Sequence, residues 1–301
     1  MPKARALAAA CLLLLGLAGC ASTATADDDR PVVVTTFTVL QDIARNVAGD
    51  HLRVESITKV GAEIHGYEPT PGDVGRAREA DLLLDNGLGL EAWFEQFVAD
   101  VDAPRVVVSE GVETIPISGD AYAGRDNPHA WMSPLNAQIY VDNIVEAFSD
   151  LDPQNADAYA DNGEAYKAQL AAVHDVMVER LAELPARQRA LVTCEGAFSY
   201  LARDAGLTEH YIWPVNAEQQ ATPRRITAVI EAVQSHGIPA VFCESTVSDD
   251  PMQRVVEATG ARFGGVLYVD SLSEQDGPVP TYLDLIRHDA DVIVTALTGD
   301  R

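Results

Sequence analysis

Short apolar runs alternate with segments of helical spacing along most of this chain, and that alternation limits the fold more than any other feature. Strands followed by helices predict parallel sheets, in which the loops at the carboxyl ends of the strands carry function. In the first half we expect strands at 31–36, 52–58, 81–84 and 105–108, with helices at 39–47, 71–80 and 90–101 between them.

A long segment with one apolar stripe divides the chain. Asp152 suits an N-cap, Pro153 suits the first turn of a helix, and Pro185 ends the segment. Apolar residues recur between them at steps of three or four, which predicts one continuous helix. Beyond it the alternation resumes, with strands at 190–193, 211–212, 240–242 and 266–269, and helices at 197–205, 223–236, 251–259 and 279–297.

These patterns predict an α/β protein with two Rossmann-like lobes. Each lobe has a parallel sheet, and one long rigid helix joins them. The expected boundaries are 31–151 for the N-terminal lobe, 152–185 for the connector helix and 186–301 for the C-terminal lobe. The net charge of −25 repels nucleic acid, so we expect no nucleic-acid partner.

The first residues form an export sequence. A basic start and the apolar run 6–18 predict a signal peptide over 1–19, too short to span a membrane stably. Its end, Leu17-Ala18-Gly19-Cys20, resembles the lipobox of bacterial lipoproteins, in which the cysteine is lipidated. An ordinary secretory signal is the alternative. With Cys20 lipidated, residues 20–30 are a flexible tether, and the protein is anchored at the outer face of the cytoplasmic membrane.

Two of the four cysteines remain after the export sequence and its cleavage site. Cys194 and Cys243 each end an apolar strand-like run, and each precedes a glutamate. Neighbouring parallel strands would bring them within bridging distance, which favours a disulfide in an oxidising compartment. Two buried free thiols are the alternative. Thiolate metal ligands are less favoured, because the residues nearby offer hard oxygen donors.

Two histidines stand in loops bracketed by Gly or Pro, and each is followed closely by an aromatic residue. His65 lies in Ile64-His65-Gly66-Tyr67, and His129 lies in Pro128-His129-Ala130-Trp131. In the second half, Glu195 and Asp270 follow apolar runs and are candidate ligands. Taken singly, the position of each acid favours a helix cap or a solvated loop carboxylate over a metal ligand.

The order of these motifs closely resembles the metal-binding lipoproteins of bacterial ABC importers, the cluster A solute-binding family for manganese, iron and zinc. The resemblance covers nearly the whole mature chain. This sequence departs from the family pattern at two places. Glu63-Ile64 stand where Asp-Pro is usual, and Asn127 stands where Asp is common; both places affect the surroundings of the ligands. The motifs are Tyr67-Glu68-Pro69-Thr70-Pro71, Asn127-Pro128-His129-Ala130-Trp131, Glu195-Gly196-Ala197-Phe198-Ser199-Tyr200 and Leu267-Tyr268-Val269-Asp270-Ser271-Leu272.

The resemblance implies that His65, His129, Glu195 and Asp270 bind a divalent metal ion in a cleft between the lobes, two from each. The metal is then a transported ligand, and the partners are a membrane permease and its cytoplasmic ATPase. We expect the protein itself to be a monomer.

Donor chemistry favours Mn²⁺ or Fe²⁺ as that ligand. Two carboxylates and two neutral imidazoles balance a divalent charge, and carboxylates can chelate with both oxygens. Zinc importers of the family have histidine where Glu195 stands, and a long His-rich loop where residues 111–127 contain no histidine. Zn²⁺ remains an alternative because it normally outbinds Mn²⁺ at sites with nitrogen and oxygen donors.

Two other classes of protein compete with this prediction. A histidine and carboxylate site can activate water in a hydrolase, but the chain has no His-Glu-x-x-His motif and no nucleophile elbow. An adhesin, in which metal binding is incidental, is the third class. We therefore expect a binding protein and not an enzyme.

Overall fold

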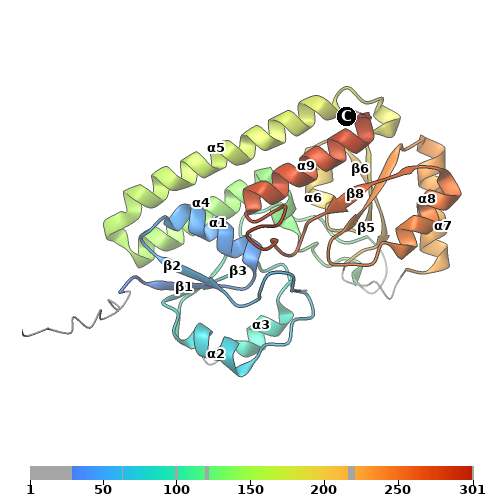
Figure 1. Ribbon diagram of the computed structural model, residues 1–301. Coiled ribbons are helices and arrows are strands. Elements are labelled where there is room, and N and C mark those ends of the chain that lie inside the picture. The colour runs from blue at the N-terminus through green and yellow to red at the C-terminus, as the bar shows by residue number, and fades with distance from the viewer. Residues whose placement is uncertain (1–28, 63, 99–100, 119–121, 216–220, 300–301) are drawn as a thin grey trace, which may run out of the picture.

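Four parallel strands form the sheet of the first half, in the spatial order β2-β1-β3-β4 (Figure 1). The computed structural model describes residues 29–62, 64–98, 101–118, 122–215 and 221–299, so the expected signal peptide, Cys20 and most of the tether lie outside it. Strand β1 pairs in parallel with both of its neighbours, β2 and β3, since Val33 lies opposite Val54 on one side and Leu82 on the other. The strands are β1 (Val32–Thr35), β2 (Arg53–Ser56), β3 (Leu82–Asp85) and β4 (Arg105–Val107).

Successive residues of β1 pack into two different cores. Val33 belongs to the main core with Ile43, whereas Val34 belongs to a smaller core with Ala77 and Phe94. Side chains alternate across a strand, so helices cover both faces of this sheet. Figure 1 shows α1 on one face and α2 and α3 on the other. Their bounds are α1 (Thr38–Ala48), α2 (Pro71–Arg78) and α3 (Ala92–Phe97).

Two long helices, α4 (Pro134–Leu151) and α5 (Ala156–Leu181), pack against each other. Helix α4 is an addition to the elements expected from the sequence, and Ser133 caps it by accepting hydrogen bonds from two backbone N–H groups. The helices approach closely at Gly163, where a Cβ atom would lie 2.6 Å from a methyl group of Val145. Helix α5 runs along the molecule from the first half to the second (Figure 1).

The connector helix is shorter than expected. Asp152 does not cap it; the Asp152 carboxylate instead accepts hydrogen bonds from Asn155 Nδ2 (2.6 Å) and from the Tyr159 hydroxyl (2.7 Å). Pro153 begins a 3-10 turn, η3 (Pro153–Asn155), and α5 starts only after it. The 26 residues of α5 span about 39 Å at 1.5 Å per residue.

The second half contains two pairs of parallel strands, β5 with β6 and β7 with β8, and β5 packs beside β7. Strand β8 begins earlier than expected, at Arg262, because two adjacent glycines obscure its apolar pattern, and it ends at Leu267, two residues before the expected end. Asp270 consequently stands in a loop past the strand. The elements are β5 (Ala190–Glu195), α6 (Ser199–Asp204), β6 (Thr208–Trp213), α7 (Pro223–His236), β7 (Ala240–Glu244), α8 (Asp250–Thr259) and β8 (Arg262–Leu267).

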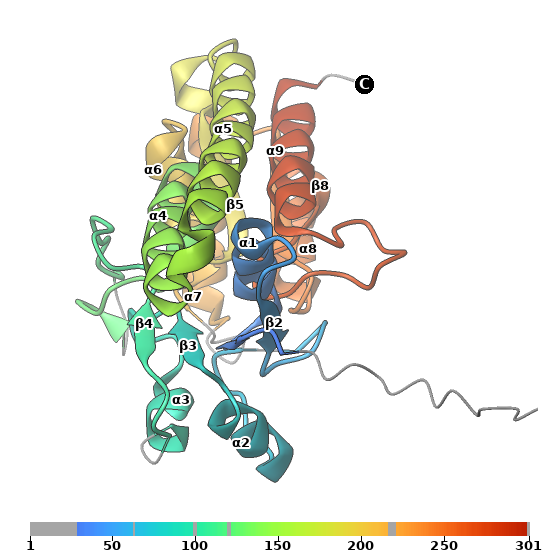
Figure 2. The ribbon, with the colours of Figure 1, turned by 90° about the vertical axis from the view of Figure 1, so that its left-hand side faces the viewer.

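The last helix, α9 (Tyr282–Thr298), begins beside the first half and runs along the second half to the end of the described chain (Figure 1). It lies beside α5 and α1, as Figure 2 shows. The backbone N–H of Tyr282 donates to Asp42 of α1 (2.8 Å), so the start of α9 is attached to the first half. Both halves of the chain are thereby joined by α5 and by α9.

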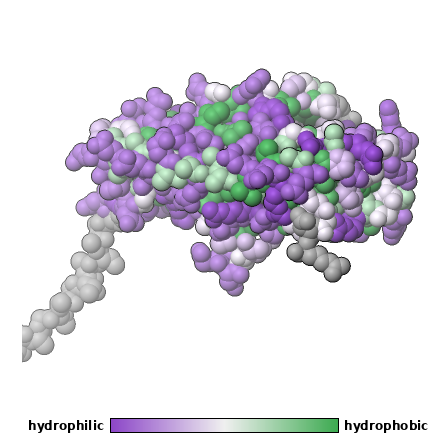
Figure 3. Space-filling view, turned by 90° about the horizontal axis from the view of Figure 1, so that it is seen from above, coloured by the Kyte–Doolittle hydropathy of each residue, from purple (hydrophilic) through white to green (hydrophobic). Residues whose placement is uncertain are grey.

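The surface above α5 and α9 is mostly hydrophilic, with scattered hydrophobic patches (Figure 3). A groove of about 480 Å³ lies between these two helices and is lined by Ala172, Val176 and Val294, among others. Across the part of the chain that the structure describes, every helix is too short or too polar to cross a lipid bilayer.

Candidate metal centre

Four side chains from distant parts of the chain meet where the two halves face each other. His65 stands in the irregular segment between β2 and α2, and His129 directly precedes the 3-10 turn η2 (Ala130–Met132). Glu195 is the last residue of β5, and Asp270 follows β8. The structure therefore brings together all four residues that the sequence singled out.

Their polar atoms lie within a few ångströms of one another. The Nε2 atoms of His65 and His129 are 3.1 Å apart. Glu195 Oε1 lies 3.7 Å from the first of these nitrogens and 3.6 Å from the second. The two Asp270 oxygens each lie 3.9 Å from one of the imidazole nitrogens. Two nitrogen and two carboxylate donors thus surround one point.

Burial sets the protonation of the two imidazoles. The His129 side chain is fully buried, and only 8% of the His65 side chain is exposed. Desolvation lowers the pKa of His65 to about 3, and desolvation together with His65 lowers the pKa of His129 well below its usual range. Both rings are therefore neutral near pH 7, which is the form that coordinates a metal.

An aromatic wall supports His129. The Trp131 ring lies 5.2 Å from the His129 ring and 5.0 Å from the Phe37 ring, measured between centroids. The Trp131 indole N–H donates to Val269 O (3.1 Å), and the Tyr282 hydroxyl donates to Trp131 O. The loop of the second half that leads to Asp270 is consequently attached to the loop that carries His129.

The segment that carries His65 is held by contacts from distant parts of the chain. The Trp93 indole N–H donates to Ile64 O (2.9 Å), directly before the histidine. Gly61 N donates to Ser271 Oγ (2.6 Å), which connects this segment to the residue after Asp270. Trp93 was not singled out from the sequence, because a tryptophan 29 residues beyond its partner leaves no local motif.

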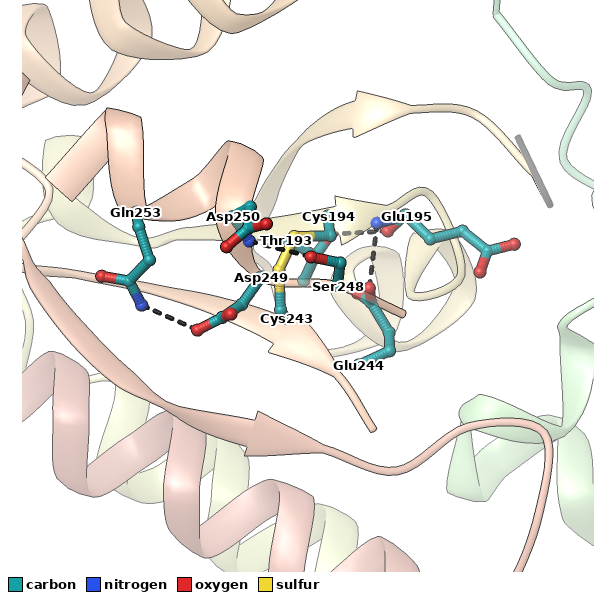
Figure 4. The surroundings of a disulfide bond; sticks show 9 residues. All are labelled: Thr193, Cys194, Glu195, Cys243, Glu244, Ser248, Asp249, Asp250 and Gln253. Carbon is teal, nitrogen blue, oxygen red and sulfur yellow. Dashed lines mark hydrogen bonds between the residues drawn. A yellow bond between two sulfur atoms is a disulfide. The ribbon is translucent and has the colours of Figure 1, made fainter. Parts of the chain in front are cut away.

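Glu195 is positioned by the strands beneath it. Cys194 and Cys243 are joined by a disulfide in the structure, with Cα atoms 4.9 Å apart. Figure 4 shows the Glu195 side chain extending away from this disulfide, while its backbone N–H donates to Glu244 Oε2 (3.1 Å). Burial, together with the nearby Glu195 and Asp270, raises the pKa of Glu244 well above its usual range.

Two groups of side chains have the spacing of metal ligands among the described residues. The first is His65, His129 and Glu195, beside which Asp270 lies; the second is Cys194, Cys243 and Glu244. The second group cannot coordinate a metal while its two sulfurs are bonded to each other. Only the first has neutral imidazoles and carboxylates facing one point.

Two α/β units with parallel strands, bridged by a long helix and with ligands meeting between them, characterise a metal-binding substrate-binding protein. The chain matches the family model described as zinc-uptake complex component A, periplasmic, over residues 33–296, and it belongs to that family. The expected family and the expected α/β fold, with parallel sheets and a long helix, are confirmed.

Characterised relatives extend over nearly the whole chain. It is 50% identical over 294 residues to the iron-binding protein YfeA of Yersinia pestis, which covers 95% of this chain and 94% of YfeA. It is 33% identical over 291 residues to the manganese ABC transporter substrate-binding lipoprotein PsaA of Streptococcus pneumoniae, covering 93% of this chain and 94% of PsaA.

Solved structures agree with this placement. The Mn-bound periplasmic metal binding protein of Candidatus Liberibacter asiaticus superposes with a TM-score of 0.84 at 38% identity, covering 89% of this chain and 100% of the other. The periplasmic zinc binding protein TroA of Treponema pallidum gives a TM-score of 0.80 at 26% identity, covering 89% and 99%.

Proposed function

We propose that this chain is the extracytoplasmic component of an ABC importer, which captures one divalent transition metal ion and delivers it to the permease. This proposal rests on one observation: four potential ligands lie together between the two halves, namely His65, His129, Glu195 and Asp270. Each of these side chains is at most 8% exposed. Burying two acids beside each other is costly unless a cation compensates their charge. A divalent ion offsets the charge of −2 from two ionised carboxylates.

The same donor set supports Mn²⁺ or Fe²⁺ as the preferred cargo. Half of the donors are carboxylates, whose oxygens are harder than imidazole nitrogen and can chelate. The similarity to proteins named for iron and manganese supports this preference. The family description names zinc, and zinc normally binds nitrogen and oxygen ligands more tightly than manganese does. Selectivity in the cell would then depend on metal supply or on the permease.

The same four ligands favour binding of a metal ion for transport over catalysis. Four protein donors leave no position reserved for the water molecule that a hydrolytic metal site activates. We therefore propose that the protein has no enzymatic turnover, and assays with ester, peptide and phosphate substrates test this. An adhesive role alone would leave growth unaffected when metal is scarce, whereas an importer component is required there.

The export sequence supports a lipid anchor. Cys20 follows three small or apolar residues at the end of the apolar run, so we propose cleavage before it and lipidation of its thiol. The anchor would hold a monomeric protein near the permease. Metabolic labelling with a fatty-acid analogue should mark the wild-type protein and leave a Cys20→Ala variant unmarked.

Calorimetry on chelator-stripped protein tests the site. Mn²⁺, Zn²⁺ and, without oxygen, Fe²⁺ should each bind in a 1:1 ratio, and combined His65→Ala and Asp270→Ala substitutions should abolish that binding. A matched control replaces His174 and Asp175, which stand on α5, by alanine and should bind like the wild type. Unchanged binding in the first double variant would refute the assignment of these ligands.

A further inference from the structure

We propose that Asn127 is a positioning residue for the metal site: its amide group fixes the tautomer of His129 and at the same time holds the turn that follows Glu195. This inference rests on the proposed metal-binding function and extends it to a residue outside the ligand set. The two ends of one side-chain amide contact the two halves of the chain.

Asn127 is buried, with 3% of its surface exposed, and its backbone is fixed. Its N–H donates to Ile115 O (2.8 Å), and its carbonyl oxygen accepts from the Tyr200 hydroxyl (2.7 Å). Tyr200 belongs to α6 in the second half. The amide group therefore extends from a backbone position that is attached on both sides.

The amide oxygen of Asn127 faces His129. It accepts from the backbone N–H of His129 (3.0 Å) and lies 2.9 Å from His129 Nδ1. A backbone N–H can only donate, so the atom beside it is the amide oxygen, and His129 Nδ1 must carry the proton that it receives. The lone pair of His129 is then on Nε2, the atom that faces His65, Glu195 and Asp270.

The amide nitrogen of Asn127 faces the other half. It donates to Gly196 O (2.7 Å) and to Ser199 Oγ (3.1 Å). Gly196 directly follows Glu195, and its own N–H donates to Trp213 O (2.9 Å). The turn after the Glu195 ligand is consequently held to the loop of the His129 ligand by one side chain.

These neighbours require an amide at position 127. A carbonyl oxygen such as Gly196 O can only accept a hydrogen bond. The Ser199 hydroxyl donates its proton to Glu209 Oε2 (2.5 Å), so its lone pairs face Asn127. A carboxylate at this position would retain the acceptor for His129 but would set an oxygen against Gly196 O.

Nitrogen-15 NMR of histidine-labelled, chelator-stripped protein tests the tautomer without any metal. The His129 ring, assigned with a His129→Gln variant, should show a proton on Nδ1 in the wild type. In Asn127→Ala the proton should move partly to Nε2, and the Mn²⁺ dissociation constant should rise about 10- to 100-fold. Asn143→Ala is the control, because Asn143 Nδ2 also donates to two oxygen atoms, both of them backbone carbonyls, at 2.8 and 2.9 Å, in another part of the first half.

Asn127→Asp separates the two roles while preserving the size of the side chain. The Nδ1 proton of His129 should remain, whereas Mn²⁺ should dissociate several-fold faster because the turn after Glu195 is released. The proposal is overturned if Asn127→Ala leaves the tautomer and the affinity unchanged, if Asn143→Ala weakens binding equally, or if Asn127→Asp slows dissociation. Absence of Mn²⁺, Fe²⁺ and Zn²⁺ binding by the wild type would refute the proposed function, and the tautomer result would still stand on its own.

Discussion

The two halves of the molecule present their ligands in different ways. Glu195 ends a strand in which every residue is buried, and a disulfide fixes the residue before it. His65 stands in an irregular segment between Ile57 and Thr70, where the flanking Gly66 is exposed. A strand end holds an acid at a fixed position, whereas a loop can adjust to a bound ion. The difference indicates that the strand end fixes Glu195 more firmly than the irregular segment fixes His65.

Removing the disulfide next to Glu195 should cause the largest loss of stability in the second half. Cys194 and Cys243 are 49 residues apart, and a crosslink that closes a loop of this length stabilises by about 4 kcal/mol in the chain-entropy model. Combined Cys194→Ala and Cys243→Ala substitutions should lower the free energy of unfolding by about that amount in denaturant titrations of metal-free protein. A dithiol reductant should destabilise the wild type and leave this variant unaffected; equal responses would contradict the proposed constraint.

Acid should destabilise the metal-free protein through the buried imidazoles of the site. Burial lowers the pKa of His65 to about 3, while an unfolded histidine has a pKa near about 6.5. Between these values the unfolded chain binds a proton that the folded, metal-free protein does not, so stability falls as the pH falls from about 6.5 to about 3. The decline should be shallower in His65→Gln and unchanged in His174→Gln. Parallel declines in all three proteins would exclude His65 as the cause.

Adding a methyl group at Gly196, directly after Glu195, should disturb the second half more locally. A Cβ atom at Gly196 would lie 2.6 Å from Pro214 O and 2.9 Å from the Tyr211 ring. Gly196→Ala should therefore cost about 1–3 kcal/mol of stability and also weaken Mn²⁺ binding, since the turn after the ligand must shift. Gly163→Ala, which crowds α4 and α5 instead, should lose stability but retain its affinity. Equal Mn²⁺ affinities in the two variants would show that the turn after Glu195 does not position the metal ligands.

Replacing one donor should change selectivity by the smallest amount. Glu195→His exchanges a chelating carboxylate for a third imidazole and lowers the negative charge of the site. Zinc should gain over manganese by roughly tenfold, about 1.4 kcal/mol, in competition titrations. An unaltered ratio of the two affinities would mean that the carboxylate at this position does not set the preference.

The sequence predicted what local chemistry determines. Runs of valine and leucine identified the strands, and the loops with His65 and His129 were recognisable from their glycine, proline and aromatic neighbours. The start of the connector was wrong, because Asp152 satisfies side chains instead of capping the helix backbone. Helix α4 was missed although Ser133 caps it and Pro134 begins it, and β8 was misplaced because two adjacent glycines obscure its apolar pattern.

The same distinction applies to the site. Each ligand candidate was visible as a residue, yet the contacts that position them join residues far apart in the sequence. The hydrogen bond from Trp93 to Ile64 and the one from Gly61 to Ser271 are of this kind, and they appear only once the chain is folded. Glu244 likewise accepts a hydrogen bond from the backbone N–H of Glu195, 49 residues earlier in the chain.

Anomalous diffraction at the manganese absorption edge tests most directly whether one metal ion is bound by both halves. Crystals of the protein grown with Mn²⁺ should give a single strong peak at coordination distance from His65 and His129 of the first half and from Glu195 and Asp270 of the second. A peak that contacts ligands from only one half, or that lies away from these four side chains, would contradict the account.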